Sequence, residues 1–317
     1  MNYVLYCCFG NKRYSKELIY SIKTFIASHK GMLHQFTIVI YTDEKNYRII
    51  SKGIEPNSIK VVFEIIDHSK ISEWTRVNNK IYMPRVKIKC IESFLRKYKS
   101  SLLFFDTDLI IIRSVKDIYL ELNNGYSTFL YSKCLSIIEF YENYKLSKSF
   151  NSSLDSMLHY RLCKKILSEK NFLPNSLNIT LQGNFNQYNS GVIGVPVTAV
   201  DIMSDILVLT DYLFENYSFY WAEEFAFSYY LNKNYCVFPC DNNCYHYSSD
   251  KWCRLLVAKS LDFFYESDFS EFQQLLSSWN IKWINSCEIK LEDIPLLVSK
   301  INKLRNIEKL PYYIETL

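Results

Sequence analysis

The sequence predicts an α/β fold with a mostly parallel central sheet, and three observations lead to it. Residues 102–105 and 109–112 are apolar runs that do not alternate with polar residues, which is typical of strands covered on both faces. Strand-like runs and helical segments alternate over the first ~110 residues, as they do in βαβ units. The chain has 317 residues, 49% of them hydrophobic, and only 7 Gly and 7 Pro, so it can build a large core without long linkers.

Strands are predicted where short runs rich in β-branched and aromatic residues are bounded by polar or turn-forming residues. The predicted strands cover residues 3–9, 36–41, 60–66, 102–105, 109–112, 127–131 and 191–195. A segment over residues 53–58, rich in Gly, Pro, Asn and Ser, predicts a turn between the second and third strands.

Helices are predicted where apolar residues recur every three or four positions. The predicted helices cover residues 14–27, 84–98, 115–122, 155–169, 199–215 and 221–231. Pro84 suits the first turn of the second helix, where its missing N–H is not needed. Beyond Trp252 the pattern stays helical and amphipathic to the end of the chain.

Asp106 and Asp108 lie between the two apolar runs and are the most informative residues of the chain. Unpaired carboxylates inside a buried strand would cost several kcal/mol each, so they are expected at a strand end that faces a crevice. An Asp-x-Asp there suits Mn²⁺ or Mg²⁺, which bind carboxylate and phosphate oxygens. The alternative is a simple turn between two strands, which Asp also tolerates.

Two further segments carry candidate site residues. Asn189, Ser190 and Gly191 precede a buried strand, where the Gly allows close approach to the backbone and the polar side chains can bind sugar hydroxyls. Glu223 and Glu224 lie near the start of a predicted helix and could bind an acceptor hydroxyl or act as its base. The alternatives are an ordinary loop for the first segment and stabilisation of the helix dipole for the second.

Four single residues complete the candidate set. His246 can add a neutral imidazole to a Mn²⁺ held by carboxylates, although a lone His among tyrosines also fits a structural role. Lys251 can pair with a phosphate. Tyr14 and Asn11 follow the first strand and suit stacking on a base and bonding to its edge; capping of the helix by Asn11 or Ser15 is the alternative.

Several function classes are disfavoured. No Gly-rich phosphate loop follows the first strand, which argues against dinucleotide and P-loop binding and against a sugar-phosphate nucleotidyltransferase. A net charge of +4 is too mild for a nucleic-acid partner, and the basic segment over residues 85–89 is interpreted as a solvated helix face. The spacing of Cys236, Cys240 and Cys244 fits no common zinc finger.

The order of these segments resembles a GT-A-fold glycosyltransferase, most similar to the family 8 group that includes glycogenin and galactosyltransferases. The resemblance spans roughly residues 3–255 and is carried by the Asp-x-Asp motif, by Asn189-Ser190-Gly191 and by His246 before Lys251. The chain lacks the Gly and Pro that the family usually places near this His and Lys, and Glu223-Glu224 replaces the more usual Asp-Gln.

The resemblance implies a catalytic domain over residues 1–255 and a helical C-terminal extension over residues 256–317 packed on it. It implies Mn²⁺, or Mg²⁺, bound by three side chains, a nucleotide-diphosphate sugar donor such as a UDP-sugar, and a retaining reaction. The implied metal ligands are Asp106, Asp108 and His246. The implied donor-binding residues are Asn11, Tyr14, Arg85, Thr107, Ser190, Gly191 and Lys251, and the implied catalytic residues are Asn189, Glu223 and Glu224.

The expected partners are the donor and a glycan, lipid-linked or protein acceptor, with no nucleic acid. The extension is rich in aromatic residues, so packing on the domain, acceptor contact, a homo-oligomer contact and a peripheral membrane contact all stay open. Ten unpatterned cysteines and the absence of a visible signal predict a cytoplasmic protein, which the membrane alternative would place at an inner membrane face. A catalytically silent nucleotide-sugar-binding protein of the same fold is the rival function.

Overall fold

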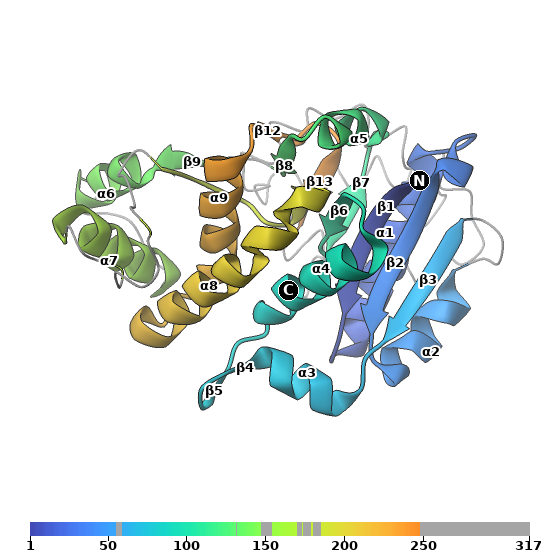
Figure 1. Cartoon of the computed structure of the whole chain (residues 1–317), viewed down its shortest axis with the longest axis horizontal. Coiled ribbons are helices and arrows are strands. Elements are labelled where there is room, and N and C mark those ends of the chain that lie inside the picture. The colour runs from blue at the N-terminus through green and yellow to red at the C-terminus, as the bar shows by residue number, and fades with distance from the viewer. Residues whose placement is uncertain are drawn as a thin grey trace, which may run out of the picture.

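The computed structural model has a central sheet between helices, with a helical hairpin projecting at one side (Figure 1). The structure describes residues 1–54, 59–130, 132–146, 154–169, 173, 179 and 185–247. The predicted C-terminal extension, Lys251 and most of the predicted turn over residues 53–58 lie outside the described residues.

The central sheet has seven strands, and β1 lies between β6 and β2. In spatial order the strands are β12 (Val237–Pro239), β8 (Ser127–Phe129), β11 (Val192–Val195), β6 (Leu102–Phe105), β1 (Asn2–Cys8), β2 (Phe36–Thr42) and β3 (Lys60–Ile65). All neighbouring pairs are parallel except those of β11, which runs antiparallel to both β6 and β8. The predicted mostly parallel sheet is therefore confirmed.

The helices cover the two faces of the sheet, except α6 and α7, which form the projecting hairpin. Their bounds are α1 (Lys12–Ser28), α2 (Glu44–Gly53), α3 (His68–Thr75), α4 (Arg85–Tyr98), α5 (Lys116–Asn123), α6 (Ile137–Leu146), α7 (Leu154–Ser168), α8 (Met203–Tyr217) and α9 (Ala222–Asn234). Alternate residues of β1 divide between two apolar clusters. Val4 and Tyr6 pack with α1, α2 and α5, whereas Leu5 packs in the cluster that contains α4, α8 and α9.

The path of the chain creates a reversal of strand order beside β1. The chain moves outward from β1 to β2 and β3, and then returns through α3 and α4 to β6 on the other side of β1. Open α/β sheets bind ligands at the carboxyl ends of the strands where the order reverses. Cys8 ends β1 and Phe105 ends β6, so this point lies directly before the Asp-x-Asp motif.

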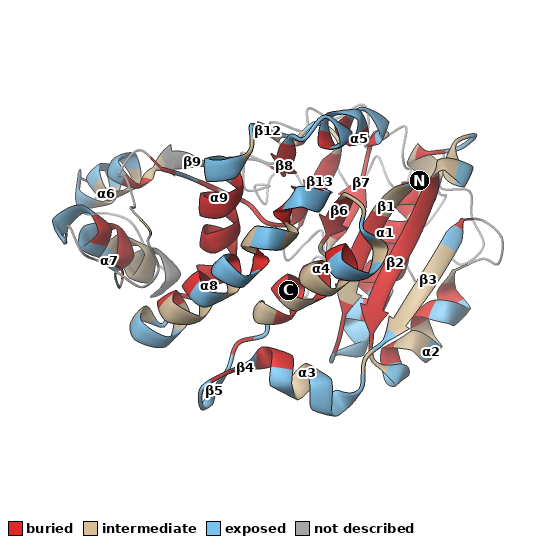
Figure 2. Ribbon diagram, viewed as in Figure 1, coloured by how far each residue is buried: buried red, intermediate tan, exposed pale blue. Residues whose placement is uncertain are grey.

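One part of the strand prediction is wrong. The second apolar run forms β7 (Leu109–Ile111), which leaves the central sheet and pairs antiparallel with β13 (Cys244–His246). Hydrophobicity alone did not distinguish the two runs, because β6 and β7 are both fully buried (Figure 2). The chain turns at residues 106–108, and because β13 pairs with β7 after this turn, β13 lies near the end of β6 although it comes much later in the sequence.

The remaining elements are short or peripheral. Within the described residues they are β4 (Arg76–Val77), β5 (Lys80–Ile81), β9 (Ser132–Ser136), β10 (Asn186–Tyr188) and the 3₁₀ turns η1 (Leu33–Gln35) and η3 (Val197–Ile202). The predicted helix over residues 199–215 begins as η3 and continues as α8. Within the part of the chain that is described, no helix has the length and apolar character that a membrane span requires.

Candidate functional site

Pairing between β6 and β11 brings the Asp-x-Asp motif against the Asn-Ser-Gly segment. Because β11 runs antiparallel to β6, the start of β11 faces the end of β6, and Val192 pairs with Phe105. The backbone N–H of Asp106 continues this ladder by donating to the carbonyl oxygen of Gly191 at 2.9 Å. Two motifs more than eighty residues apart in the sequence (191 − 106 = 85) thus meet by strand register.

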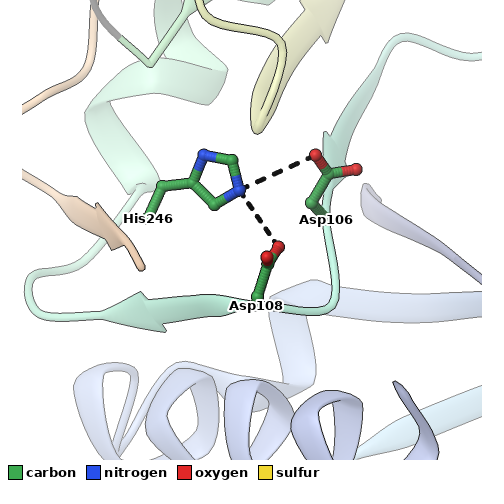
Figure 3. Close-up of side chains that lie close together, drawn as sticks. All are labelled: Asp106, Asp108 and His246. Carbon is green, nitrogen blue, oxygen red and sulfur yellow. Dashed lines mark hydrogen bonds and ion pairs between the residues drawn. The ribbon is translucent and has the colours of Figure 1, made fainter. Parts of the chain in front are cut away.

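Pairing between β7 and β13 places His246 beside Asp108. His246 lies opposite Leu109 in this ladder, and the backbone N–H of Tyr247 donates to the carbonyl oxygen of Asp108 at 3.2 Å. The β6–β11 pair fixes Asp106 and the β7–β13 pair fixes Asp108 and His246, so both carboxylates lie close to the imidazole (Figure 3). Thr107, between the two acids in the sequence, is half-buried.

Asp106, Asp108 and His246 form a compact group that can hold a metal ion (Figure 3). Their ligand atoms lie within 4.8 Å of one another. His246 Nε2 is 3.0 Å from Asp108 Oδ1 and 3.9 Å from Asp106 Oδ2. Among the described residues this is the only such group of three His, Cys, Asp or Glu side chains, and Cys236, Cys240 and Cys244 do not form one.

The imidazole of His246 is fixed by Asn189 and by the absence of a side chain at Gly191. Asn189 Oδ1 accepts from the backbone N–H of Gly191 at 2.9 Å and lies 3.1 Å from His246 Nδ1. A carbonyl acceptor at Nδ1 favours the tautomer with its proton there, which leaves the Nε2 lone pair for a cation. A Cβ at Gly191 would lie 2.6 Å from His246 Nδ1, so the observed orientation of the imidazole requires glycine at this position.

The electrostatics of the group fit a bound cation. Burial raises the pKa of Asp106 above its ordinary value despite the opposing charges of Lys87 and His246, and Asp108 adds to the rise. Burial disfavours the imidazolium, but Asp108 and Asp106 outweigh it and raise the pKa of His246. A divalent cation at these atoms would supply the positive charge that the two carboxylates otherwise favour as a proton on His246.

Lys87 is the functional residue that sequence reasoning missed. The predicted solvated helix face over residues 85–89 is wrong at this position, because the Lys87 side chain is only 9% exposed. Its Nζ lies 3.1 Å from Asp106 Oδ1 and 3.2 Å from Glu223 Oε1, and it donates to both the carbonyl oxygen and the hydroxyl of Ser190 at 3.1 Å. Burial disfavours the ammonium, but Asp106 and Glu223 raise the pKa of Lys87 above its ordinary value and keep it charged.

The two acids of α9 have different surroundings. Glu224 holds the segment that leads into β11: its Oε1 accepts from Gln187 Nε2 at 2.7 Å and its Oε2 accepts from the backbone N–H of Ser190 at 3.2 Å. Glu223 instead faces Lys87, and its Oε2 accepts from the Ser190 hydroxyl at 3.4 Å. Burial raises the pKa of Glu223 to about 7, although Lys87 opposes the rise.

Arg85 is not brought to this group. Its guanidinium forms a two-pronged ion pair with Asp211 of α8, at 2.7 Å and 3.0 Å, and also donates to the carbonyl oxygen of Trp74 at 2.8 Å. Its charge is therefore already paired with the Asp211 carboxylate. Lys87, two residues on, supplies the positive charge that reaches Asp106.

Asn11 and Tyr14 lie at the start of α1, just beyond the carboxyl end of β1. Asn11 caps α1, because its side-chain oxygen accepts from the backbone N–H of Arg13 at 2.9 Å. Tyr14 is 38% exposed, and the Arg13 guanidinium carbon lies 5.3 Å from its ring centre. Asn11 therefore caps the helix, as the alternative interpretation expected. The Tyr14 ring is accessible at the same edge of the sheet as Asp106.

Comparison with known proteins gives structural matches only. No protein-family model matches the sequence, and no curated protein matches it. WbbM, a bifunctional glycosyltransferase, superimposes with a TM-score of 0.50 and 12% identity over 89% of this chain and half (50%) of that chain. LgtC, a galactosyltransferase in complex with donor and acceptor sugar analogues, has a TM-score of 0.49, 10% identity and coverage of 90% and 100%. Mouse xyloside xylosyltransferase 1 has a TM-score of 0.49, 11% identity and coverage of 84% and 94%.

At these identities the likeness concerns the fold alone, and the WbbM superposition carries it. The chain therefore shares the GT-A fold of WbbM, and the predicted fold class is confirmed. The candidate metal group lies at the edge of the sheet where such folds bind ligands.

Proposed function

We propose that this protein is a metal-dependent glycosyltransferase that moves a sugar from a nucleotide-diphosphate donor, a UDP-sugar, to an acceptor hydroxyl. The convergence of Asp106, Asp108 and His246 at the point of strand reversal in a GT-A sheet carries this proposal. Fold alone does not determine function, so the chemistry of the site is the stronger support.

The side chains suit Mn²⁺ better than Mg²⁺, because an imidazole completes a set of two carboxylates. Asp106, Asp108 and His246 would hold the cation, with Nε2 of the imidazole directed to it by the bond between Nδ1 and Asn189. When bound, the cation would supply positive charge that stabilises the departing nucleotide diphosphate.

The chain's own residues account for the remaining roles. Tyr14 offers an accessible ring on which a base can stack, and the Asn11 amide nitrogen can meet the edge of that base. Thr107 and Gly191 border the metal group, and Lys251 is assigned to phosphate by the motif resemblance. The oxygen of Asn189 is used by His246 and Gly191, so only its amide nitrogen can contact the donor sugar.

We also propose that the anomeric configuration is retained. Retention rests on the motif resemblance, and in such a reaction the leaving diphosphate can accept the acceptor proton, so no protein base is required. Glu223 then orients the sugar or the acceptor from its position beside Lys87 and Ser190. The acceptor is a glycan, a lipid-linked sugar or a protein.

A donor panel tests the proposal. The purified full-length protein is incubated with UDP- and GDP-sugars and Mn²⁺, and the released nucleotide is measured. Slow release from a UDP-sugar is expected, together with its loss on chelation. Asp108→Asn should abolish release, whereas Asp117→Asn on the exposed first turn of α5 should not.

The rival function gives a different pattern. A catalytically silent protein would bind a UDP-sugar in calorimetry with Mn²⁺ and release no nucleotide with any acceptor extract. Release that persists in EDTA would contradict the metal requirement. A product of inverted configuration, read from proton NMR couplings, would contradict retention.

A further inference from the structure

Lys87 joins three parts of the site that come from separate elements. It extends from the first turn of α4 to Asp106 at the end of β6, to Ser190 before β11 and to Glu223 at the start of α9. The ammonium is therefore a direct contact between Asp106, one of the proposed metal ligands, and the acid of α9.

The ammonium has more acceptors than protons. Five oxygen atoms surround it: both carboxylate oxygens of Asp106 at 3.1 Å and 3.3 Å, the carbonyl oxygen and hydroxyl of Ser190, and Glu223 Oε1 at 3.2 Å. A lysine has only three N–H donors. Lys87 can therefore give up Asp106 and still direct every N–H to Ser190 and Glu223.

Under the proposed function, two positive charges would interact with the Asp106 carboxylate: the Lys87 ammonium and the bound cation. A cation held by Asp106, Asp108 and His246 would lie on the same carboxylate that Lys87 contacts. Like charges that share a partially buried carboxylate repel, and water screens them weakly there. The ammonium must weaken cation binding even as it keeps Asp106 and Glu223 in place.

We propose that Lys87 is a positioning residue that competes with the cation for Asp106 and keeps Glu223 and Ser190 as its partners when the cation takes that carboxylate. This inference rests on the proposed function. Glu223 is not one of the proposed metal ligands, but Lys87 contacts both Glu223 and the ligand Asp106. The position of Glu223 would therefore depend on whether the cation is bound, which is a coupling between two sites.

The inference predicts opposite changes in two measured quantities. Replacing Lys87 by an uncharged side chain removes the competing charge, so Mn²⁺ should bind about tenfold more tightly, within the usual range of such couplings. The same change frees Glu223 and Ser190, so nucleotide release should fall by roughly a hundredfold, as a misplaced active-site group does. A side chain with only a structural role would lower both quantities when removed.

The experiment compares Lys87→Met, which keeps a long unbranched side chain beside Phe104, whose ring centre lies 5.0 Å from Lys87 Nζ, with Lys87→Gln, which keeps a donor for Ser190. Lys89→Met is the matched control, since Lys89 lies on the same helix and pairs only with Glu92 among its described partners. Free Mn²⁺ is measured by electron paramagnetic resonance, and thermal unfolding is followed on the same samples. Lys87→Arg should keep the charge and leave Mn²⁺ affinity within about threefold of the parent.

Tighter Mn²⁺ binding with slower release in either uncharged variant supports the inference. Equal or weaker Mn²⁺ binding in a folded variant overturns it, and so does failure of both variants to fold, because Lys87 would then serve stability alone. If the parent binds Mn²⁺ but releases no nucleotide, the proposed function fails while the Mn²⁺ measurement still decides the role of Lys87.

Discussion

Gly191→Ala is the substitution for which the structure gives the sharpest expectation. An added Cβ would lie 2.6 Å from His246 Nδ1 and 2.9 Å from Asn189 Oδ1. Ordinary contacts of a Cβ begin near 3.4 Å, so the imidazole must move by at least about 0.8 Å (3.4 − 2.6). Both obstructing atoms belong to side chains, so the fold can absorb the methyl group while the metal group loses the orientation of His246.

Loss of a bond that orients a metal ligand typically costs 10- to 100-fold in metal affinity. Gly191→Ala should therefore bind Mn²⁺ roughly 10- to 100-fold more weakly, measured by electron paramagnetic resonance, with little change in the unfolding midpoint. Gly194→Ala on β11 is the matched control. Its Cβ would meet Thr128 and Leu122 in the core at 2.4 Å and 2.8 Å, so it should lower stability and leave Mn²⁺ affinity unchanged. Parental Mn²⁺ affinity in Gly191→Ala would refute the role given to this glycine.

Three other predictions use different observables. Asp108→Asn removes a charge beside His246 and no core side chain, so it should lower Mn²⁺ affinity at least about tenfold with an unchanged far-ultraviolet spectrum. Glu223→Gln should leave measurable transfer under retention, whereas Glu224→Gln should disturb the segment before β11 and lower thermal stability; complete loss of transfer in a folded Glu223→Gln would favour a catalytic base. Burial lowers the pKa of His29 to about 4 from 6.5, so the neutral ring stabilises the fold above pH 6.5. That contribution, about 3 kcal/mol, should disappear between pH 6.5 and 4 in urea titrations and be absent in His29→Gln.

The buried strands and the position of the Asp-x-Asp motif at a strand end were predictable from sequence, because burial on both faces leaves an uninterrupted apolar run. The motif at residues 106–108 and the segment at residues 189–191 were both placed at strand ends, and β6 and β11 bring them together. The sheet to which β7 belongs was not predictable, because an apolar sequence shows that a strand is buried but not which strand it pairs with. Helices α2 and α3 were missed because each buries only two or three residues and so shows little periodicity.

Lys87 shows why a site residue can escape a reading of sequence pattern. Arg85, Lys87 and Lys89 lie in one short basic segment, for which the sequence pattern predicts a solvated face, whereas in the structure Arg85 and Lys89 form partly buried ion pairs with Asp211 and Glu92. One physical signal was present, however. A cation in the first turn of a helix is opposed by the helix dipole, so a lysine there needs a nearby carboxylate. The partner, Asp106, is separated from it by the whole length of α4 and β6.

The charges of the site explain how these residues act together under the proposed function. With His246 neutral, Asp106, Asp108 and Glu224 contribute three formal negative charges and Lys87 one positive charge, and Glu223, whose pKa is raised to about 7, adds a further negative charge where it is ionised. The dipole of α9 stabilises its two first-turn acids, but it does not reach a full unit of charge. A donor diphosphate would add further negative charge to this edge of the sheet, so it can bind only with a cation that the triad already attracts. Under the proposed function, the excess of carboxylates would be the reason for a metal requirement, and the proposed competition of Lys87 for Asp106 would limit how tightly that metal is held.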